Sequence, residues 1–172
     1  GLANKGISQL WSGTIKVGKR QFKVKVSACH RQGPKTLPMR LRFSPAEEGI
    51  EPSYNPSMTW LVEPMVTYNE LPGLGRAEAE ASFKRQAAHE LGHSVLAKAD
   101  SHLVSWMHKG TSQLWQTPMP WRPDAASQSQ LDLMSYYNSG AAATLPTTKF
   151  RKKKASEEDL KKLIWGAQLE WV

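Results

Sequence analysis

The sequence predicts an α+β fold in which a small, mostly antiparallel sheet packs on one long helix, with a second helix near the C-terminal end. Three observations predict this fold. Residues 1–70 are rich in short stretches where apolar and polar residues alternate, as in half-buried strands. Residues 75–99 and 156–170 instead show the longer apolar spacing of helices. A chain of 172 residues suits a single domain, so we expect residues 1–172 to form one.

The strand-rich part begins with a predicted β-hairpin. Ile15 and Val17 alternate with polar residues, the same pattern resumes at Phe22, and Gly18 and Lys19 supply the turn between them. Two further strands are expected, at residues 37–43 and at residues 58–70, the second bent at Pro64.

The helix expected at about residues 75–99 is the clearest element of the chain. It has apolar residues at every fourth position: Phe83, Ala87, Leu91 and Val95. Residues 100–148 show no long periodic segment, and an irregular stretch of this length within a domain is usually functional. The last helix, at about residues 156–170, starts with Ser156 and Asp159 in the spacing of a capping box.

The chain is basic, with a formal net charge of +8 and a pI near 9.7. Such a charge favours an anionic partner, such as nucleic acid, a membrane surface or a cell-envelope polymer. The run KFRKKK, residues 149–154, is interpreted as a solvated basic linker, and no nucleic-acid recognition motif accompanies it, so nucleic acid is not the favoured partner. No apolar run is long enough for a membrane span.

The segment AAHELGHSVL, residues 87–96, contains the pattern His-Glu-x-x-His. On a helix, His89 and His93 lie one turn apart on the same face, so both imidazoles can reach one metal ion. Glu90 is next to the first histidine and can take a proton from an attacking water. Two nitrogen ligands and one carboxylate base are what a zinc peptidase requires, so we expect Zn²⁺ here and an enzyme that hydrolyses peptide bonds.

A catalytic zinc usually has three protein ligands, and the spacing leaves three candidates for the third. His108 ranks first, because fifteen residues after His93 allow the chain to leave the helix and return across the site. Asp132 ranks second and His102 third, because His102 lies too near the expected helix end to reach back easily.

The stretch HELGHSVLAKADSHLVSWMHKGTS resembles the active-site segment of SprT/Spartan-like minimal zinc proteases. In that resemblance His89, Glu90, His93 and His108 occupy the motif positions, and Lys109 separates His108 from the glycine that follows it in the family.

About fifty residues, from the motif helix through HKGTS to LDLMSYY, are more closely similar to metallopeptidase toxin domains at the C-termini of bacterial polymorphic toxins and type VI secretion spike (VgrG) proteins. This resemblance implies a zincin fold and an effector that a bacterial secretion system delivers into a target cell, with the target periplasm as one destination. It also implies a parent spike or toxin chain and a cognate immunity protein as partners. The opening residues GLANKG, without an initiator Met or a signal segment, agree with a piece of a longer chain.

The segment LDLMSYY, residues 131–137, offers supporting residues for the site. Met134 is interpreted either as a floor beneath the zinc ligands or as an ordinary core residue. Tyr136 and Tyr137 are candidate catalytic donors to the oxyanion of a tetrahedral intermediate, and we expect one of them at most to act. If His108 is the third ligand, Asp132 fits better as a hydrogen-bond partner of a ligand histidine.

Two other functions remain open at this point. One is a basic module that binds nucleic acid or an anionic envelope polymer, with zinc structural or absent. The other is a DNA-associated protease of the Spartan type. The first would show binding that falls steeply with salt, and the second would use its basic surface to recruit substrate.

The ranking of the third ligand can be tested with single substitutions. His108→Ala should reduce zinc affinity about as much as His93→Ala, whereas His102→Ala should leave it near normal, because only a ligand contributes directly to the bound ion. Competition with a chromogenic chelator measures these affinities. Normal zinc binding by His108→Ala would assign the third position to Asp132.

Overall fold

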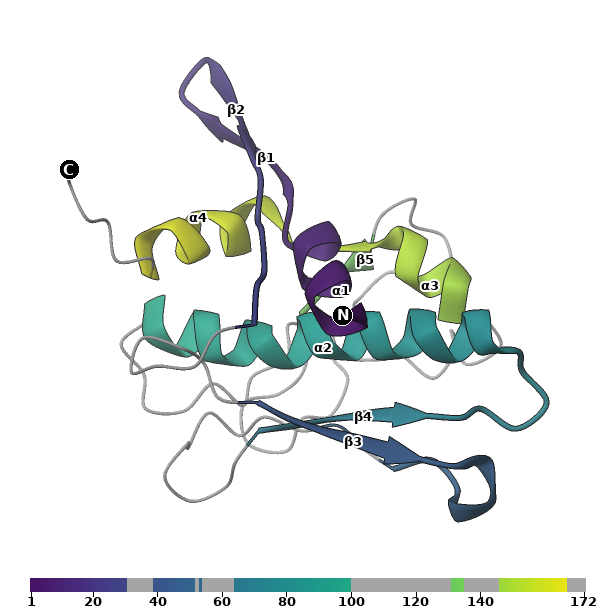
Figure 1. Cartoon of the computed structure of the whole chain (residues 1–172). Coiled ribbons are helices and arrows are strands. Elements are labelled where there is room, and N and C mark those ends of the chain that lie inside the picture. The colour runs from purple at the N-terminus through teal and green to yellow at the C-terminus, as the bar shows by residue number, and fades with distance from the viewer. Residues whose placement is uncertain (31–38, 52, 54–63, 100–130, 135–145, 167–172) are drawn as a thin grey trace, which may run out of the picture.

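The computed structural model describes residues 1–30, 39–51, 53, 64–99, 131–134 and 146–166, and the fold is given for these residues (Figure 1). In chain order the elements are α1 (Leu2–Leu10), β1 (Gly13–Val17), β2 (Arg20–Val24), β3 (Arg40–Ser44), the short 3-10 helix η1 (Ala46–Glu48), β4 (Met65–Asn69), α2 (Arg76–Ala99), β5 (Leu131–Asp132), α3 (Pro146–Lys152), β6 (Lys153–Lys154) and α4 (Glu157–Gly166).

Helix α2 forms the middle layer of the molecule (Figure 1). The pair β3–β4 covers one side of α2, and helices α1, α3 and α4 lie on the opposite side. The β1–β2 hairpin projects away from the body on the side of α1 and α4. The α+β class expected from the sequence is confirmed.

The strands form three separate pairs in the described part of the chain. β1 and β2 pair antiparallel around Gly18, whose φ of 60° suits a residue without Cβ, and this confirms the predicted hairpin. The pairs β3–β4 and β5–β6 are parallel, which differs from the mostly antiparallel sheet expected. A parallel pair needs a crossover of a dozen or more residues, and residues 45–64 between β3 and β4 are long enough to supply one.

The two helices expected from the sequence are present with nearly the expected limits. α2 starts just after Gly75, whose carbonyl accepts hydrogen bonds from the N–H groups of Glu78 and Ala79. α4 starts with the expected capping box: the N–H of Asp159 donates to Ser156 Oγ at 3.1 Å, and the N–H of Ser156 donates to Asp159 Oδ2 at 3.3 Å.

Two helices were not expected. α1 occupies residues interpreted only as the start of a longer chain, although Ile7, Leu10 and Trp11 share a helix face and are buried. α3 and β6 together contain the run KFRKKK, so its interpretation as a solvated linker was wrong. Lys153 within the run is only 5% exposed, and the segment is tied to the core where the N–H of Ala155 donates to the Leu10 carbonyl.

Two apolar clusters flank α2, one on each side. The larger one joins α2 to α1, β1, α4 and the turn after β5; its buried members are Ile7, Leu10, Trp11, Ile15, Ala88, Val95, Leu96, Leu133, Met134, Ala155 and Leu160. The smaller one joins α2 to β4 through Val66, Phe83 and Ala87. Because α2 packs against other elements on two sides, its apolar residues are not confined to a single face. The apolar spacing in the sequence therefore indicates only one of its two packed faces.

Within the described ranges, no helix is both long enough and apolar enough to cross a membrane.

The contact between α1 and α2 predicts that replacing Gly6 with any larger residue destabilises the fold. A Cβ atom on Gly6 would overlap the backbone carbonyl of Lys84 in α2, so the helices can approach this closely only at glycine. Gly6→Ala should therefore lower the free energy of unfolding by about 2 kcal/mol, even though alanine favours helix formation by about 1 kcal/mol over glycine. Gly75→Ala is the control, because a Cβ there meets no atom within 4 Å. Urea unfolding followed by circular dichroism measures both, and an unchanged midpoint for Gly6→Ala would contradict the packing.

Candidate metal and catalytic site

The three motif residues lie on α2, where the sequence places them. The imidazole rings of His89 and His93 are 5.0 Å apart between centroids, at an interplanar angle of 86°. His89 is half-buried, whereas His93 and Glu90 are almost completely buried. The helix therefore brings two nitrogen donors together one turn apart and places a carboxylate beside the first of them.

A backbone carbonyl orients the ring of His89. Its Nδ1 lies 2.9 Å from the carbonyl oxygen of Leu133, which can only accept a hydrogen bond. Nδ1 therefore carries the hydrogen in the neutral ring, and Nε2 keeps its lone pair for another partner. This is the arrangement that a metal-binding histidine needs, because the second nitrogen fixes the tautomer and the direction of the first.

The turn that carries Leu133 is itself held in place. The N–H of Leu133 donates to the carbonyl of Lys154 at 2.7 Å, continuing the pairing of β5 with β6. Asp132 was expected to support a ligand histidine. Its Oδ1 accepts a hydrogen bond from the N–H of Met134 at 2.8 Å, which closes the turn, and the carbonyl of Leu133 supports His89. Asp132 thus stabilises the segment that orients the histidine.

Met134 and Trp11 pack against α2 at Gly92, the residue before His93. Both side chains are fully buried, and a Cβ on Gly92 would overlap the sulfur of Met134 and come within 2.9 Å of the Trp11 ring. The indole N–H of Trp11 also donates to the carbonyl of Ala88 at 2.8 Å. Met134 therefore belongs to the larger apolar cluster and at the same time supports the turn of α2 that carries the histidines.

The carboxyl of Glu90 has an unusual environment. Burial raises its pKa to about 7, and the nearby Arg85 guanidinium opposes this rise only in part. Burial likewise lowers the pKa of Arg85 to about 10, with Glu90 opposing that change. A carboxyl that titrates near neutral pH can both take and return a proton under physiological conditions, as a general base and acid must.

The remaining predicted site residues lie outside the described residues: His102, His108, Tyr136 and Tyr137. Among the side chains that the structure describes, no three His, Cys, Asp or Glu groups are arranged to hold a metal ion. The described residues nevertheless fit a metal as far as they go, because His89 and His93 are two neighbouring nitrogen donors and His89 is held in the ligand tautomer.

Sequence reasoning missed four contributors to this site: Trp11, Arg85, Gly92 and the Leu133 carbonyl. Gly92 carries the most visible signal, since a glycine inside an otherwise regular helix often marks a close packing contact. A backbone carbonyl such as that of Leu133 has no signature in the sequence.

Comparison with models of protein families, with curated proteins and with solved structures finds no match for this chain.

The environment of Glu90 predicts how the stability of the metal-free chain depends on pH. Because the pKa of Glu90 is about 7 in the folded chain and 4.5 ordinarily, folding favours the protonated form. The free energy of unfolding should therefore fall as the pH rises from 4.5 to 7 and level off above that range. Glu90→Gln removes this ionisation and should add on the order of 2 kcal/mol more stability at pH 8 than at pH 5.

Urea unfolding in the presence of a chelator measures this difference. Glu48→Gln, which removes an exposed carboxylate in η1, controls for the substitution itself. An equal effect of Glu90→Gln at both pH values would show that burial does not perturb this carboxyl.

Proposed function

We propose that this chain is a zinc metallopeptidase that hydrolyses peptide bonds. The observation that carries the proposal is the paired histidines on α2, with His89 turned by the Leu133 carbonyl and the buried Glu90 beside it. Two nitrogen donors one turn apart, with a carboxyl next to the first of them, match the requirements of such an enzyme better than two isolated histidines on a helix surface would.

His89, His93 and His108 would hold the zinc ion, with Asp132 as the alternative third ligand. When bound, zinc acts as a Lewis acid that polarises the scissile carbonyl and favours loss of a proton from water. The N–H of Met134 occupies one oxygen of the Asp132 carboxylate, and His108 stays the first-ranked third ligand because of its spacing from His93.

Glu90 would take the proton of the attacking water and later deliver it to the leaving amine. In the metal-free chain burial raises the pKa of Glu90 to about 7, and a neighbouring zinc ion would favour the ionised carboxylate, which is the form that accepts a proton. Arg85 favours the ionised form of Glu90 and so keeps the carboxyl available as a base in its buried position. Tyr136 or Tyr137 would donate a hydrogen bond to the developing oxyanion.

The wider role that we propose is that of a secreted effector, a toxin domain of a larger secretion-system protein. The resemblance of residues from the motif helix to LDLMSYY supports this role. An effector of this kind would have a protein substrate in the target cell, and the producing cell would contain an immunity protein against it. The alternatives are a basic binding module without catalysis and a DNA-associated Spartan-like protease, and the basic charge of the chain favours each of them.

Replacing Glu90 separates catalysis from metal binding. The reconstituted chain should contain about one zinc per molecule and should cleave an unfolded protein such as casein. Glu90→Ala should keep the zinc and the fold but lose roughly a hundred- to ten-thousand-fold in the rate of cleavage, because the proton acceptor is gone. Elemental analysis and a cleavage assay on the same samples give both quantities.

Glu80→Ala is the matched control, since it removes a carboxylate of the same helix that, among the described residues, pairs with Arg76 and Lys84. It should cleave casein normally. Absence of zinc after reconstitution would refute the enzyme. Expression in a bacterial periplasm extends the test: a folded, zinc-loaded Glu90→Ala chain that stays as harmful as the parent would favour the binding module.

A further inference from the structure

The positive charge of this protein is concentrated in the first 46 residues. No Asp or Glu precedes Glu47, whereas this segment contains ten of the 23 Lys and Arg residues: Lys5, Lys16, Lys19, Arg20, Lys23, Lys25, Arg31, Lys35, Arg40 and Arg42. The rest of the chain has 13 basic and 15 acidic residues. The net charge of +8 therefore belongs to the N-terminal part, and the KFRKKK run is balanced by acidic residues elsewhere.

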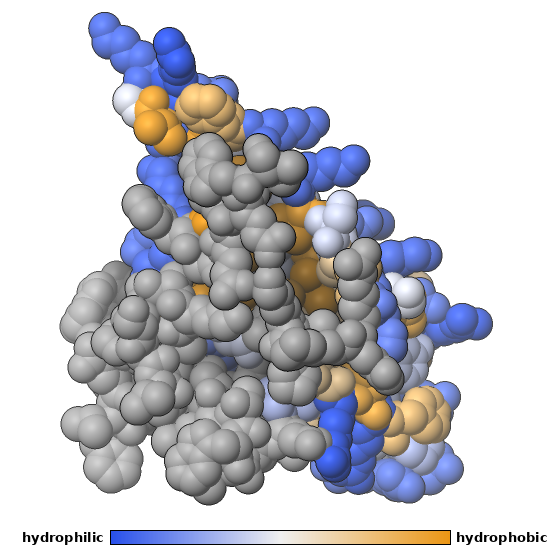
Figure 2. All heavy atoms as spheres, turned by 60° about the vertical axis from the view of Figure 1, so that its left-hand side comes forward, coloured by the Kyte–Doolittle hydropathy of each residue, from blue (hydrophilic) through white to orange (hydrophobic). Residues whose placement is uncertain are grey.

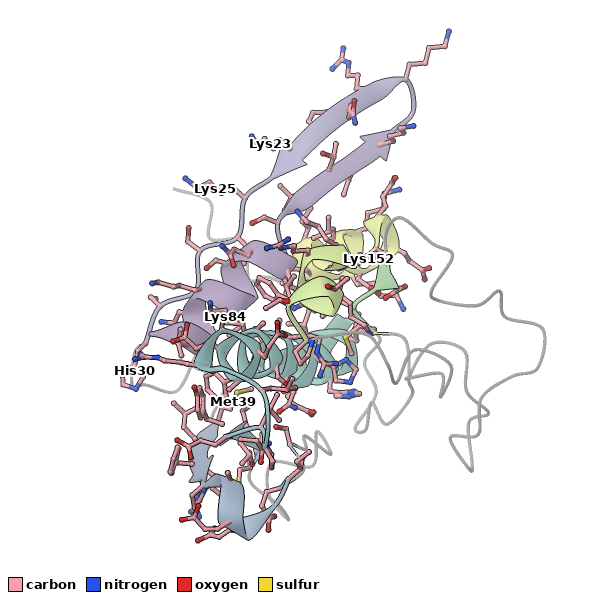
Figure 3. All side chains as sticks on the ribbon, turned by 90° about the vertical axis from the view of Figure 1, so that its right-hand side faces the viewer. Lys23, Lys25, His30, Met39, Lys84 and Lys152 are labelled. Carbon is pink, nitrogen blue, oxygen red and sulfur yellow. The ribbon has the colours of Figure 1, made fainter. Side chains whose placement is uncertain are left out.

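The β1–β2 hairpin displays this charge in an ordered form. Its register pairs Ile15 with Phe22 and Val17 with Arg20, so the apolar side chains share one face. The opposite face carries Thr14, Lys16, Gln21 and Lys23. Figure 3 shows Lys23 and Lys25 extending outward from β2 and from the chain that follows it. The hairpin is thus amphipathic, with lysines along its polar face.

The body of the protein covers only part of the apolar face. Ile15 is buried in the larger apolar cluster and Val24 packs against that cluster. Phe22, the cross-strand partner of Ile15, is 47% exposed, and Val17, next to the turn, is 57% exposed. Val17 and Phe22, with Lys19 and Arg20 between them, form the tip of the hairpin. In Figure 2 the projecting hairpin shows a small apolar patch with hydrophilic side chains above and beside it. Lys19 and Arg20, both exposed, stand at the turn beside this patch.

Hydrogen bonds attach the hairpin to the body within β1 and just after β2. On one strand, the N–H of Lys16 donates to Glu157 Oε1 at 2.9 Å. After the other strand, the N–H groups of Val26 and Ala28 donate to the hydroxyls of Ser12 and Ser8, each at 2.9 Å. The exposure of the tip is therefore a property of the fold.

We propose that the tip of this hairpin binds the surface of an anionic lipid bilayer. Val17 and Phe22 would enter the interface between headgroups and acyl chains, and the surrounding lysines and arginine would contact anionic headgroups. Exposed apolar side chains beside Lys19 and Arg20 match a surface that is apolar beneath and anionic above.

Nucleic acid matches the tip less well. Single-stranded nucleic acid is bound by several aromatic side chains on which successive bases stack, and the hairpin has one aromatic residue, Phe22. Val17, the most exposed apolar residue of the hairpin, cannot stack on a base. A lipid interface, in contrast, accepts aliphatic as well as aromatic side chains. This inference does not depend on the proposed peptidase activity.

The test measures sedimentation of the whole chain with vesicles at low and physiological salt. Vesicles of phosphatidylglycerol and phosphatidylcholine in equal amounts should bind the protein, and vesicles of phosphatidylcholine alone should bind it at least about tenfold more weakly. The double variant Val17→Ser/Phe22→Ser should lose about tenfold or more in affinity for the anionic vesicles, because both side chains lose their place in the interface. Lys19→Glu/Arg20→Glu should lose at least as much.

Two controls place the binding at the tip. Ile50→Ser removes an apolar side chain of similar exposure, 68%, two residues after η1. Arg151→Glu reverses an exposed charge on α3. Both should bind anionic vesicles like the parent, and circular dichroism confirms the fold of every variant.

Three outcomes would overturn the proposal. Equal binding to both kinds of vesicle would show that anionic headgroups are not recognised. Equal loss in the tip variants and in the two controls would show that the hairpin is not the contact. Binding to a single-stranded oligonucleotide without binding to anionic vesicles would assign the basic surface to nucleic acid.

Discussion

The burial of α2 between two layers is the constraint on which the rest of the structure depends. One side packs against β4 and the other against α1, α4 and the turn after β5. On the second side the neighbouring elements approach α2 very closely. Gly6 of α1 allows the backbone of α2 to come near, and Gly92 of α2 leaves room for buried side chains, because neither glycine has a Cβ atom. Burying an ionisable group is unfavourable unless it is paired or hydrogen-bonded, so the surroundings of Glu90 and His93 depend on how α2 packs.

The packing of α2 also sets the surroundings of the motif residues. Burial raises the pKa of Glu90, and the turn after β5 places a backbone carbonyl against His89. The same contacts therefore contribute to the stability of the fold and determine the environment of the candidate site. Trp11 and Met134 belong to both, because they fill the core and support the turn of α2 at Gly92. A substitution at either position should affect the geometry of the histidines as well as the stability of the chain.

Periodicity and capping residues were enough to predict the local elements. The spacing from Phe83 to Val95 predicted α2, Ser156 and Asp159 predicted the start of α4, and the alternation around Gly18 predicted the hairpin. The pairing of β3 with β4 was not predicted, because the direction of pairing depends on the route of the chain between strands. α1 was missed because it is short and contains a glycine that disfavours helix in isolation but is required by the contact with α2.

The motif identified the centre of the candidate site for a similar reason. The spacing of His89, Glu90 and His93 along the helix can be read directly from the sequence. The carbonyl of Leu133 is contributed by the backbone and reaches His89 across 44 residues, so only the fold reveals it. Arg85 is five residues before Glu90 on the same helix, but its effect depends on how deeply both groups are buried, which the sequence does not state.

The attachment of Leu133 has a consequence for the order in which the site is completed as the chain is synthesised. The helix with the motif is synthesised before Leu133, whose carbonyl orients His89. The N–H of Leu133 donates to the carbonyl of Lys154, which is synthesised later still. Trp11 is synthesised before all of these residues, but its indole N–H can donate to the Ala88 carbonyl only once α2 has been made. A chain still emerging from the ribosome therefore carries the complete His-Glu-x-x-His motif while lacking the contacts that orient it. The motif residues therefore reach their ordered arrangement only after nearly all of the described chain has been synthesised and has folded.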